Sequence, residues 1–526
     1  MMYSLLALVA IAVAISYFLT KPRKNLPPGP QPLPIVGNIR DLPDGTAPEY
    51  QHWLKFKDLY GPICHLTIFG KSLIIIHDRD AANTILEKSS VKTSGRPQFV
   101  FGNEMCGYNR VLSFLPYGEK FKHQRKLIHQ QLGTKATASR FRDTQDVESR
   151  RLLLRILERP DKLSEHIKTE ASAIILKMTY GYNLEPHKSD PLALLIDEMM
   201  HNFSRAFVPM TWPADILPIL RYFPEFLPGM SFKRIAREWN ANMSMVLNVP
   251  YEFAKKQIGK QSHAQSYVSS LIKQHDGRLD KVDETAIKET AAAMYAGGSD
   301  TTVLSIRAFI LAMLLFPDVQ KKAQQEIDTV VGTHRLPDFS DRDKLPYVDA
   351  LVKEALRWIP VVPMGVAHTA DEDIHYKEFV IPKGACFIQA TWWLLHDPAT
   401  YSNPSSFDPD RYLEPRNEPD PKFASFGFGR RVCPGRFLAD ESLFITISRL
   451  LSAFEMKKAA DEHGNDIEPE IGITPGMIAH LHEYPYDIKP RDEKYSDLIR
   501  QVQVEHPWEE GDAQFLGDFS LWATEA

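Results

Sequence analysis

The sequence predicts a mainly α-helical protein with a small β-rich region near the front of the chain, preceded by one membrane-spanning helix. Helical patterns dominate residues 121–317, where β-rich runs are few. Apolar runs at 63–69 and 72–76 flank a Gly-Lys turn and indicate a β-hairpin. The first 20 residues carry no charged side chain. A chain of 526 residues, 44% hydrophobic and 25% charged, has a globular composition and can bury a core that encloses a ligand.

The uncharged start of the chain predicts a membrane anchor. A helix of about 20 residues spans ~30 Å, the thickness of a bilayer core. Lys21, Arg23 and Lys24 follow it, and positive residues stay on the cytoplasmic side, so the body is expected to face the cytosol. The alternative is a cleaved signal peptide, which starts with basic residues and has a shorter apolar run. Here the basic cluster follows the apolar run, which favours a single-pass protein.

Changes in composition along the rest of the chain predict a hinge, a body and a C-terminal extension. Proline fixes φ and blocks helix formation, so the run from Leu26 to Pro34 indicates a stiff, extended spacer. Further helices are expected at 341–358 and at 435–454, where the last helix should end. Residues 505–526 hold six acidic and no basic side chains and are expected to form a loose tail. The predicted parts are an anchor (1–20), a basic and Pro-rich hinge (21–34), a body (35–490) and an acidic C-terminal extension (491–526).

Charge and cysteine content exclude several classes of protein. The 62 Lys and Arg against 67 Asp and Glu leave a net charge of −5, whereas general nucleic-acid binders are basic. We therefore expect no nucleic-acid partner. The four cysteines are too sparse for a disulfide framework and form no CxxC metal pair, which favours a reducing compartment. They are Cys64, Cys106, Cys386 and Cys433.

One of these cysteines lies in an unusual segment, Phe-Gly-Phe-Gly-Arg-Arg-Val-Cys-Pro-Gly, at 426–435. Its glycines permit backbone conformations that side chains forbid, so a tight loop is expected. Cys433 directly precedes a helical run, and positive charge and a helix N-terminus both favour a thiolate. A lone cysteine is more often a buried structural residue, and that alternative stands for Cys433 taken alone. Three arginines are expected near the sulfur: Arg430, Arg431 and Arg436.

The spacing Phe426-x-x-Gly429-x-Arg431-x-Cys433-x-Gly435 resembles the haem-binding loop of the cytochrome P450 family. The resemblance implies the cytochrome P450 fold and haem b as cofactor, with Cys433 as the axial ligand of the iron. A thiolate ligand pushes electron density toward oxygen and favours O–O cleavage. By the same resemblance Phe426 would shield the sulfur and Arg431 would pair with a haem propionate. Gly429 and Gly435 would let the backbone come close to the iron ligand.

A Glu-Arg pair upstream resembles a second signature of this family. Glu354 and Arg357 are three residues apart and so share one helix face. Taken alone, such a pair is usually a solvated surface pair. The family resemblance makes it the ExxR signature, and Arg411, in the segment 407–412, would complete the network. Breaking a buried network of this kind is costly, so we expect a role in folding the haem pocket, not in chemistry.

The segment Ala-Gly-Gly-Ser-Asp-Thr-Thr at 296–302 lies within a long apolar helical run. Two glycines inside a helix cost roughly 1 kcal/mol each, which a nearby ligand or a kink would explain. Simple helix packing is the alternative. The segment resembles the distal helix of the family, where Thr301 would hydrogen-bond iron-bound oxygen and Asp300 would help relay protons. Gly297 stands where alanine is more usual and is expected to leave slightly more room near the iron.

Two further basic residues are expected to contact the haem propionates. The segment 117–125 resembles the family's propionate-binding helix, with Arg125 as the propionate partner. The family usually has tryptophan where Phe121 stands, and phenylalanine has no N–H to donate. His368 stands where the family often has a basic propionate contact. A solvated basic face and an ordinary surface histidine are the alternatives.

The resemblance spans 27–490 and implies that the body is a haem-thiolate monooxygenase domain. Such a domain inserts one atom of O₂ into an organic substrate and reduces the other to water. The chain has no nicotinamide or flavin fingerprint, so electrons from NADPH are expected to arrive through NADPH–cytochrome P450 reductase. Lys122, Lys422 and Arg430 are candidates for its docking face. An anchored body facing the cytosol, with membrane lipid as a partner, implies the endoplasmic reticulum membrane.

The substrate is expected to be a hydrophobic small molecule, because the segments that could line its pocket are apolar. Each segment could equally be ordinary core. The chain resembles fungal members that tailor secondary metabolites, which suggests a terpenoid or polyketide intermediate. The segments are Phe99–Phe101, Phe203–Trp212, Met294, Val361–Met364 and Pro475–Ile478.

Three other functions remain as alternatives. Family members that rearrange peroxides need no reductase, but they tend to lack an acid-alcohol pair such as Asp300-Thr301. A membrane-tethered lipid carrier would leave the Cys433 loop unexplained. A cysteine hydrolase with Cys433 as nucleophile would need a histidine base and an oxyanion site, which the sequence does not locate.

Overall fold

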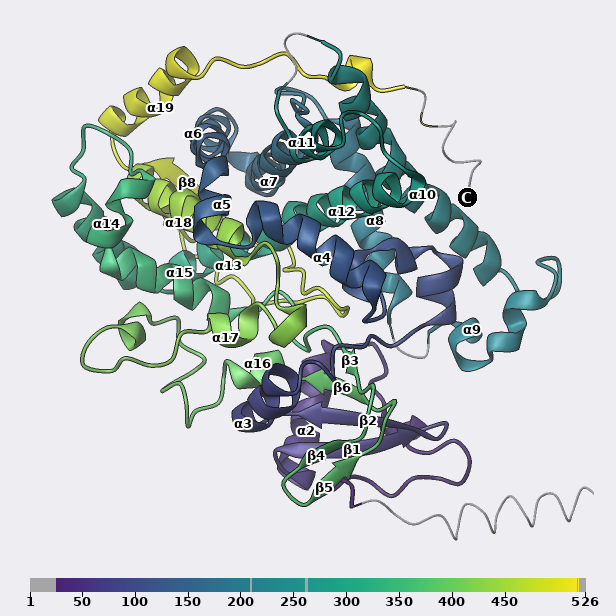
Figure 1. The fold of residues 1–526 in the computed structure, drawn as a ribbon. Coiled ribbons are helices and arrows are strands. Elements are labelled where there is room, and N and C mark those ends of the chain that lie inside the picture. The colour runs from purple at the N-terminus through teal and green to yellow at the C-terminus, as the bar shows by residue number, and fades with distance from the viewer. Residues whose placement is uncertain (1–24, 209–210, 261–263, 518, 520–526) are drawn as a thin grey trace, which may run out of the picture.

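Residues 25–208, 211–260, 264–517 and 519 are described by the computed structural model shown in Figure 1. Helices make up most of this part of the chain, and the strands form one four-stranded and two two-stranded sheets. The mainly α fold class with a small β region is thereby confirmed. The predicted anchor at 1–20 lies outside the described residues, as does the basic part of the hinge at 21–24.

The helices surround a central pair, α12 and α13, that crosses the body (Figure 1). Helix α12 packs against α7, α4, α8 and α10, and α13 packs against α7, α15 and α18. The helices longer than four residues are α2 (Glu49–Tyr60), α4 (Glu119–Leu132), α6 (Arg142–Glu158), α7 (Leu163–Tyr180), α8 (Pro191–Ala206), α10 (Phe232–Gln257), α11 (Tyr267–Gln274), α12 (Lys281–Ser299), α13 (Thr301–Leu315), α14 (Pro317–Val330), α15 (Pro346–Trp358), α18 (Arg436–Ala453) and α19 (Glu493–Glu505). The single-turn helices are α3 (Arg79–Ala82), α5 (Lys135–Ala138), α9 (Pro213–Ile216), α16 (Thr391–Leu394) and α17 (Lys422–Ser425).

The main sheet joins the front of the chain to a segment 300 residues later. Its strand order is β1-β2-β6-β3. The predicted hairpin is confirmed as β1 (Ile63–Ile68) and β2 (Lys71–Ile76), which pair antiparallel. Strand β2 pairs in parallel with β6 (Cys386–Gln389), and β6 pairs antiparallel with β3 (His368–Thr369). The two small sheets are β4 (Ile374–Tyr376) with β5 (Phe379–Ile381), and β7 (Phe454–Lys457) with β8 (Asp487–Pro490).

Two predicted helices are present with shifted starts. Helix α15 begins at Pro346, because proline fits the first helical turn but cannot continue a preceding helix. The residues before it, Phe339–Lys344, form a separate 3₁₀ helix. Helix α18 spans Arg436–Ala453, close to the predicted 435–454. It is not the last helix, since α19 follows within the C-terminal extension.

The prediction of a loose tail is wrong for the described part of 505–526. The Asp512 amide donates to the Asn183 carbonyl over 2.9 Å, and Glu509 pairs with Lys177 of α7 at 2.7 Å. The Trp508 ring lies 4.8 Å from the Arg155 guanidinium of α6. Acidic composition alone therefore misled the prediction, because these acids meet basic side chains on the body.

One described helical stretch, Lys281–Leu315, is long and apolar enough to cross a membrane. It comprises α12 and α13, and 72% of its most apolar window is buried inside the protein. A buried position of this kind is typical of a core helix, and the high hydropathy follows from packing on several sides. The pair is therefore the central core element of the body.

Candidate active site

Residues 426–435 form a tight loop between α17 and α18, as their glycines predict. The Cys433 amide donates to the Phe426 carbonyl over 2.8 Å and closes the loop. Gly429 has φ +55°, and a Cβ there would lie 2.5 Å from the Leu86 carbonyl oxygen. A side chain is therefore excluded at Gly429 by both conformation and space. Gly435 caps α18 with an ordinary φ of −87°, and no atom lies within 4 Å of where its Cβ would be.

The Cys433 thiol has a mixed electrostatic environment. Burial raises its pKa, while the Gly435 N–H and the guanidinium groups of Arg125 and Arg436 act in the opposite direction. Of the three arginines expected beside the sulfur, only Arg436 is among the groups that act on the Cys433 pKa. The second guanidinium that acts on it is that of Arg125 from α4, not that of Arg430 or Arg431. Burial is the largest effect, so the pKa of the Cys433 thiol lies above its usual value. A bound metal ion would deprotonate it on coordination.

Arg431 turns away from the sulfur and into the interior. It donates to the carbonyls of Ser94 at 2.8 Å and Leu115 at 2.7 Å. Its guanidinium carbon lies 3.8 Å from the centre of the Phe121 ring, which is a close cation–π contact. Phe121, in the position where tryptophan is usual, therefore supports Arg431 by stacking instead of donating a hydrogen bond.

Three other basic residues lie with Arg431. His368 is buried and shares a hydrogen bond of 2.8 Å with the Thr93 carbonyl. Arg125 donates to the Val432 carbonyl over 2.6 Å. Arg96, which the sequence analysis missed, donates to the carbonyls of Ser113, Val366 and Ala367. We refer to Arg96, Arg125, His368 and Arg431 as the cation group.

The cation group is electrostatically incomplete. Burial and the neighbouring Arg431 lower the pKa of Arg96, and burial together with Arg96 and Arg431 lowers the pKa of His368 well below its usual value. Among the described residues, no Asp or Glu forms an ion pair with any member of the group, although the Asp371 carboxylate acts favourably on Arg431 from farther away. Carbonyl oxygens orient these donors but bring no negative charge. A group carrying carboxylates, such as the two propionates of haem, fits this donor set.

The sulfur needs no partner ligand from the protein. In the part of the chain that the structure describes, no group of three or more His, Cys, Asp or Glu side chains could hold a metal ion. A single thiolate would be sufficient to hold haem iron, because the porphyrin itself supplies nitrogen ligands. The lone Cys433, the open space at Gly435 and the cation group are therefore consistent with one another.

The predicted network around Glu354 is present and completely buried. Arg357 binds both Glu354 oxygens at 2.8 Å, and Arg411 binds Oε1 at 3.0 Å. These three side chains have no exposed surface. The sequence analysis missed two further members. Tyr412 donates to Glu354 over 2.9 Å, and Glu418 pairs with Arg411 at 2.6 Å. We call this set the paired network.

The predicted distal segment is a break between two helices, not a continuous helix. Helix α12 ends at Ser299 and α13 begins at Thr301, with Asp300 between them. The Thr301 hydroxyl donates to the Gly297 carbonyl over 2.7 Å. At the break this carbonyl therefore accepts a hydrogen bond from a side chain, which is a common cause of a kink. A kink was one of the two explanations for the paired glycines.

Glycine occupies positions 297 and 298 for different structural reasons. A Cβ on Gly298 would lie 2.8 Å from the Ile175 side chain of α7, so Gly298 permits close helix packing. Nothing lies within 4 Å of a Cβ on Gly297, which leaves open space beside the break. The packing alternative is thus correct for Gly298, while the expectation that Gly297 leaves more room near the iron stays a prediction.

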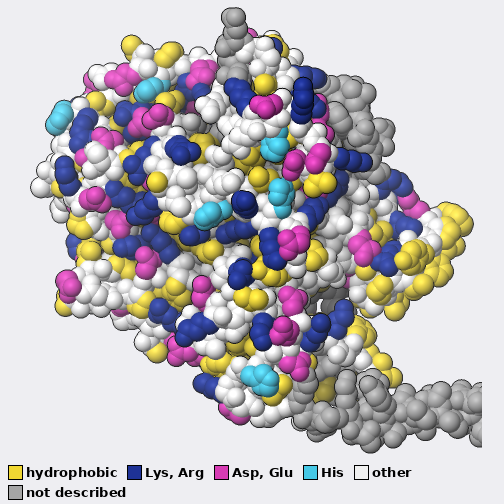
Figure 2. Space-filling model, viewed as in Figure 1, with side chains coloured by type: hydrophobic (Ala, Val, Ile, Leu, Met, Phe, Trp, Pro, Cys, Tyr) yellow, Lys and Arg dark blue, Asp and Glu magenta, His cyan; other side chains and the backbone are white. Residues whose placement is uncertain are grey.

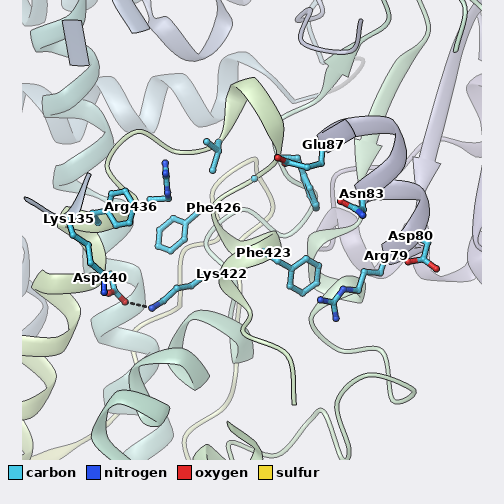
Figure 3. A pocket seen from close by; sticks show the side chains of 14 residues that line it. Arg79, Asp80, Asn83, Glu87, Lys135, Lys422, Phe423, Phe426, Arg436 and Asp440 are labelled. Atoms are coloured by element: carbon cyan, nitrogen blue, oxygen red, sulfur yellow. Dashed lines mark ion pairs between the residues drawn. The ribbon is translucent and has the colours of Figure 1, made fainter. Parts of the chain in front are cut away.

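A hollow of about 540 Å³ lies on the outer side of the Cys433 loop. Figure 3 shows the rings of Phe423 and Phe426 within it, with charged side chains around them. Arg79 lies over the Phe423 ring at 4.1 Å, and Lys422 pairs with Asp440 at 2.7 Å. Its lining residues are Arg79, Asp80, Asn83, Glu87, Lys135, Lys422, Phe423, Phe426, Gly427, Phe428, Val432, Arg436, Phe437 and Asp440.

Comparison with known proteins gives the same assignment. A family model described as Cytochrome P450 matches residues 27–482. Cytochrome P450 monooxygenase CLM2 of Gibberella zeae is 52% identical, with 97% of this chain and 98% of that protein covered. Multifunctional cytochrome P450 monooxygenase af510 of Aspergillus fumigatus is 44% identical over 98% and 97%. O-methylsterigmatocystin oxidoreductase of Aspergillus flavus is 36% identical over 94% of each chain.

The family match covers most of the chain and includes both the Cys433 loop and the paired network. The relatives match nearly from end to end, so the likeness is not confined to one motif. The chain belongs to the cytochrome P450 family and is a cytochrome P450 monooxygenase.

Proposed function

We propose that Cys433 is the thiolate ligand of haem b and that this chain inserts one oxygen atom from O₂ into a hydrophobic organic substrate. The observation that carries the proposal is a lone thiol beside a largely buried cation group that forms no ion pair with a described carboxylate and on which only Asp371 acts from farther away. When bound, a thiolate-ligated haem supplies the activation of O₂. Residues 35–490 form the domain that holds it.

The chain's own residues fix the cofactor. Arg125, Arg431 and His368 hold the propionates, together with Arg96. The Gly435 N–H donates to the Cys433 sulfur and stabilises its negative charge, which is how neighbouring donors tune a metal-bound thiolate. Phe426 lies between the sulfur and the outer hollow and shields the ligand from water.

Asp300 and Thr301 would hold and pass protons at the break between α12 and α13. Cleavage of O₂ requires protons delivered to a defined oxygen atom, and a positioned carboxylate and hydroxyl can hold and pass them. The break between α12 and α13 presents both groups at one point of the helix pair. Glu354, Arg357 and Arg411 take no part in this chemistry and maintain the fold around the Cys433 loop.

The substrate is a hydrophobic molecule, and we propose a terpenoid or polyketide intermediate of secondary metabolism. Phe203, Met294 and Ile478 belong to one apolar cluster, as the predicted pocket walls require. Phe101 and Trp212 belong to the same buried cluster and stack on each other with ring centres 3.7 Å apart. One relative is named O-methylsterigmatocystin oxidoreductase, and this name supports an organic small molecule as the substrate of this chain.

NADPH–cytochrome P450 reductase supplies the electrons, and it docks over the outer hollow near Cys433. Figure 2 shows Lys and Arg side chains spread across the middle of this face with acidic ones between them. Lys422 is paired with Asp440 and Lys122 with Glu119, so their charges are partly neutralised within the chain. Docking therefore relies on the apolar floor of the hollow as well as on charge.

The protein is held at the endoplasmic reticulum membrane by its first 20 residues, with the body in the cytosol. Exposed apolar residues after α9 give the body its own contact with lipid, and contiguous patches of this kind mark interaction surfaces. They lie at the right-hand edge of Figure 2. The residues are Leu217, Ile219, Tyr222, Phe223 and Phe226.

The carbon monoxide complex of the reduced protein tests the proposal. A thiolate-ligated haem gives a strongly red-shifted Soret band, which the wild type is expected to show and Cys433→Ala to lose with all activity. Cys386→Ala is the matched control and should keep both. A wild-type protein that stays colourless after haem supplementation would refute the proposal. Full activity without iron would favour a cysteine hydrolase instead.

A further inference from the structure

The carboxylate of Asp300 has a partner that neither the sequence analysis nor the family resemblance supplied. Asp300 lies between α12 and α13, and its side chain makes no capping hydrogen bond to either helix. Its Oδ2 instead lies 3.0 Å from His480 Nε2. Among the described residues, His480 is the only side chain that pairs with this carboxylate. The Asp300 side chain is 13% exposed.

The backbone of His480 is fixed from within its own loop. The loop doubles back on itself, with Ile473 opposite Leu481 and the Thr474 amide donating to the His480 carbonyl over 2.9 Å. The neighbouring Ala479 amide donates to Val361 over 2.9 Å. A side chain on such an anchored backbone can hold its partner in one position.

Helix α13 binds the same loop at a second point. Arg307 donates to the carbonyls of Leu481 at 3.2 Å and His482 at 3.0 Å. The Tyr484 hydroxyl donates back to the Arg307 carbonyl over 2.7 Å. Asp300 and Arg307 are about two helical turns apart on the helix, so the loop is attached at both places and cannot slide along it.

The tip of this loop, 475–478, is also a predicted wall of the substrate pocket. Ile478 lies in the apolar cluster that contains Met294 of α12, and Met477 packs against the same cluster. The loop therefore touches the pocket at its tip and the acid at its base. A displacement at the tip reaches Asp300 through the backbone between Ile478 and His480.

We propose that His480 is a positioning residue for Asp300. By donating from Nε2, it holds one carboxylate oxygen at the helix break and leaves the other to handle protons, and it ties the substrate-lining loop to that acid. His480 is 39% exposed, and ion pairs that solvent reaches contribute little to stability, so the value of this one lies in orientation. The inference rests on the proton-handling role proposed above for Asp300.

The test compares three single substitutions in the haem-loaded, full-length protein. His480→Ala removes the donor, His480→Gln keeps an N–H near the position of Nε2, and His482→Ala removes the exposed histidine two residues away. Peroxide released per NADPH consumed should rise severalfold in His480→Ala, toward its limit of one, and should stay below the value in a variant that lacks the proton donor itself. It should stay at the wild-type level in His480→Gln and His482→Ala. The carbon monoxide spectrum should be unchanged in all three.

A second readout does not depend on turnover. Amide hydrogen exchange at 300–304 in the resting protein should be faster in His480→Ala only, because the break loses its tie to the loop. Wild-type peroxide release and exchange rates in His480→Ala would overturn the inference.

Asp300→Asn separates the two hypotheses. If Asp300→Asn itself stays coupled, the proton-handling role of Asp300 fails. If it uncouples while His480→Ala does not, only the positioning role of His480 fails. Combining Asp300→Asn with His480→Ala should release no more peroxide than Asp300→Asn alone, because both changes remove one pathway.

Discussion

Two groups of buried arginines in this protein differ in what neutralises them. In the paired network, Arg357 and Arg411 are matched by the carboxylates of Glu354 and Glu418. In the cation group, the hydrogen bonds of Arg96 and Arg431 go to backbone carbonyls, and no described carboxylate forms an ion pair with them, although Asp371 acts on Arg431 from farther away. Both groups are well ordered by hydrogen bonds. Only the first is balanced in charge.

The difference separates a structural role from a binding role. Desolvating a charge is costly unless it is paired, so a balanced network is complete once the chain has folded. A group that is oriented but not neutralised is complete only when an anionic ligand arrives. Both places use largely buried arginines, and the partner decides the function.

The largest effect is expected from unbalancing the paired network. Glu354→Gln preserves shape but leaves two buried arginines with one carboxylate. Removing one member of a buried pair typically costs about 3–5 kcal/mol, enough to unfold a marginally stable domain. The free energy of unfolding from urea titration, together with the fraction of protein that retains haem, measures the loss.

Glu455→Gln is the matched control, since it makes the same chemical change on the exposed strand β7. Its partner Lys457 is 63% exposed, and pairs of this kind contribute roughly 0–1 kcal/mol. If Glu354→Gln cost no more than this control, the paired network would not be the structural element described above.

The paired network also illustrates how far sequence reasoning extends. Glu354, Arg357 and Arg411 were predicted because their spacing resembles a family signature, and they do meet. Glu418 was missed because it follows Arg411 by seven residues in an irregular loop, where no periodicity relates one side chain to another. The fold class and the hairpin were predictable for the opposite reason, since both depend on local periodic patterns.

The cation group shows the other limit. Arg96 comes from a loop between Gly95 and Pro97, and His368 from a two-residue strand. The β-sheet brings His368 near the Arg96 loop through a bridge between Gly95 and Thr369. Long-range pairing of this kind has no signature in a single sequence. His480 was missed likewise, because only tertiary packing brings a C-terminal loop to the break at Asp300.

A smaller effect is expected from weakening the cation group, and it should appear in ligand retention. Arg96→Gln and Arg431→Gln each remove one charge that a propionate would meet. A hydrogen bond to a charged group contributes about 1.5–3 kcal/mol, which corresponds to roughly 10- to 100-fold faster haem loss. Arg96→Lys keeps the charge, so its rate of haem loss should lie between those of the wild type and Arg96→Gln. Transfer of haem to an excess of a haem-scavenging protein gives the rates, and wild-type retention in both Gln variants would show that the group is not a propionate site.

The smallest effect is a pH dependence confined to the paired network. Burial raises the pKa of Glu418, but hydrogen bonds from Ser402, Arg416 and Arg411 outweigh it and lower the pKa to about 2, against 4.5 for an ordinary glutamate. A lowered pKa in the folded state stabilises the protein above pH 4.5, and this contribution is lost as the pH falls toward 2.

Glu418→Gln removes that contribution, so the variant should be less stable than the wild type at pH 7 and approach it on acidification. Urea unfolding midpoints between pH 7 and the lowest pH at which the protein stays folded would trace the narrowing gap. Glu455→Gln, the exposed control used above, makes the same chemical change outside the paired network and should run parallel to the wild type over this range. A gap for Glu418→Gln that stays constant with pH would mean that Glu418 acts through packing, and the contrast between a charge-balanced and an unbalanced arginine group would then lose its electrostatic basis.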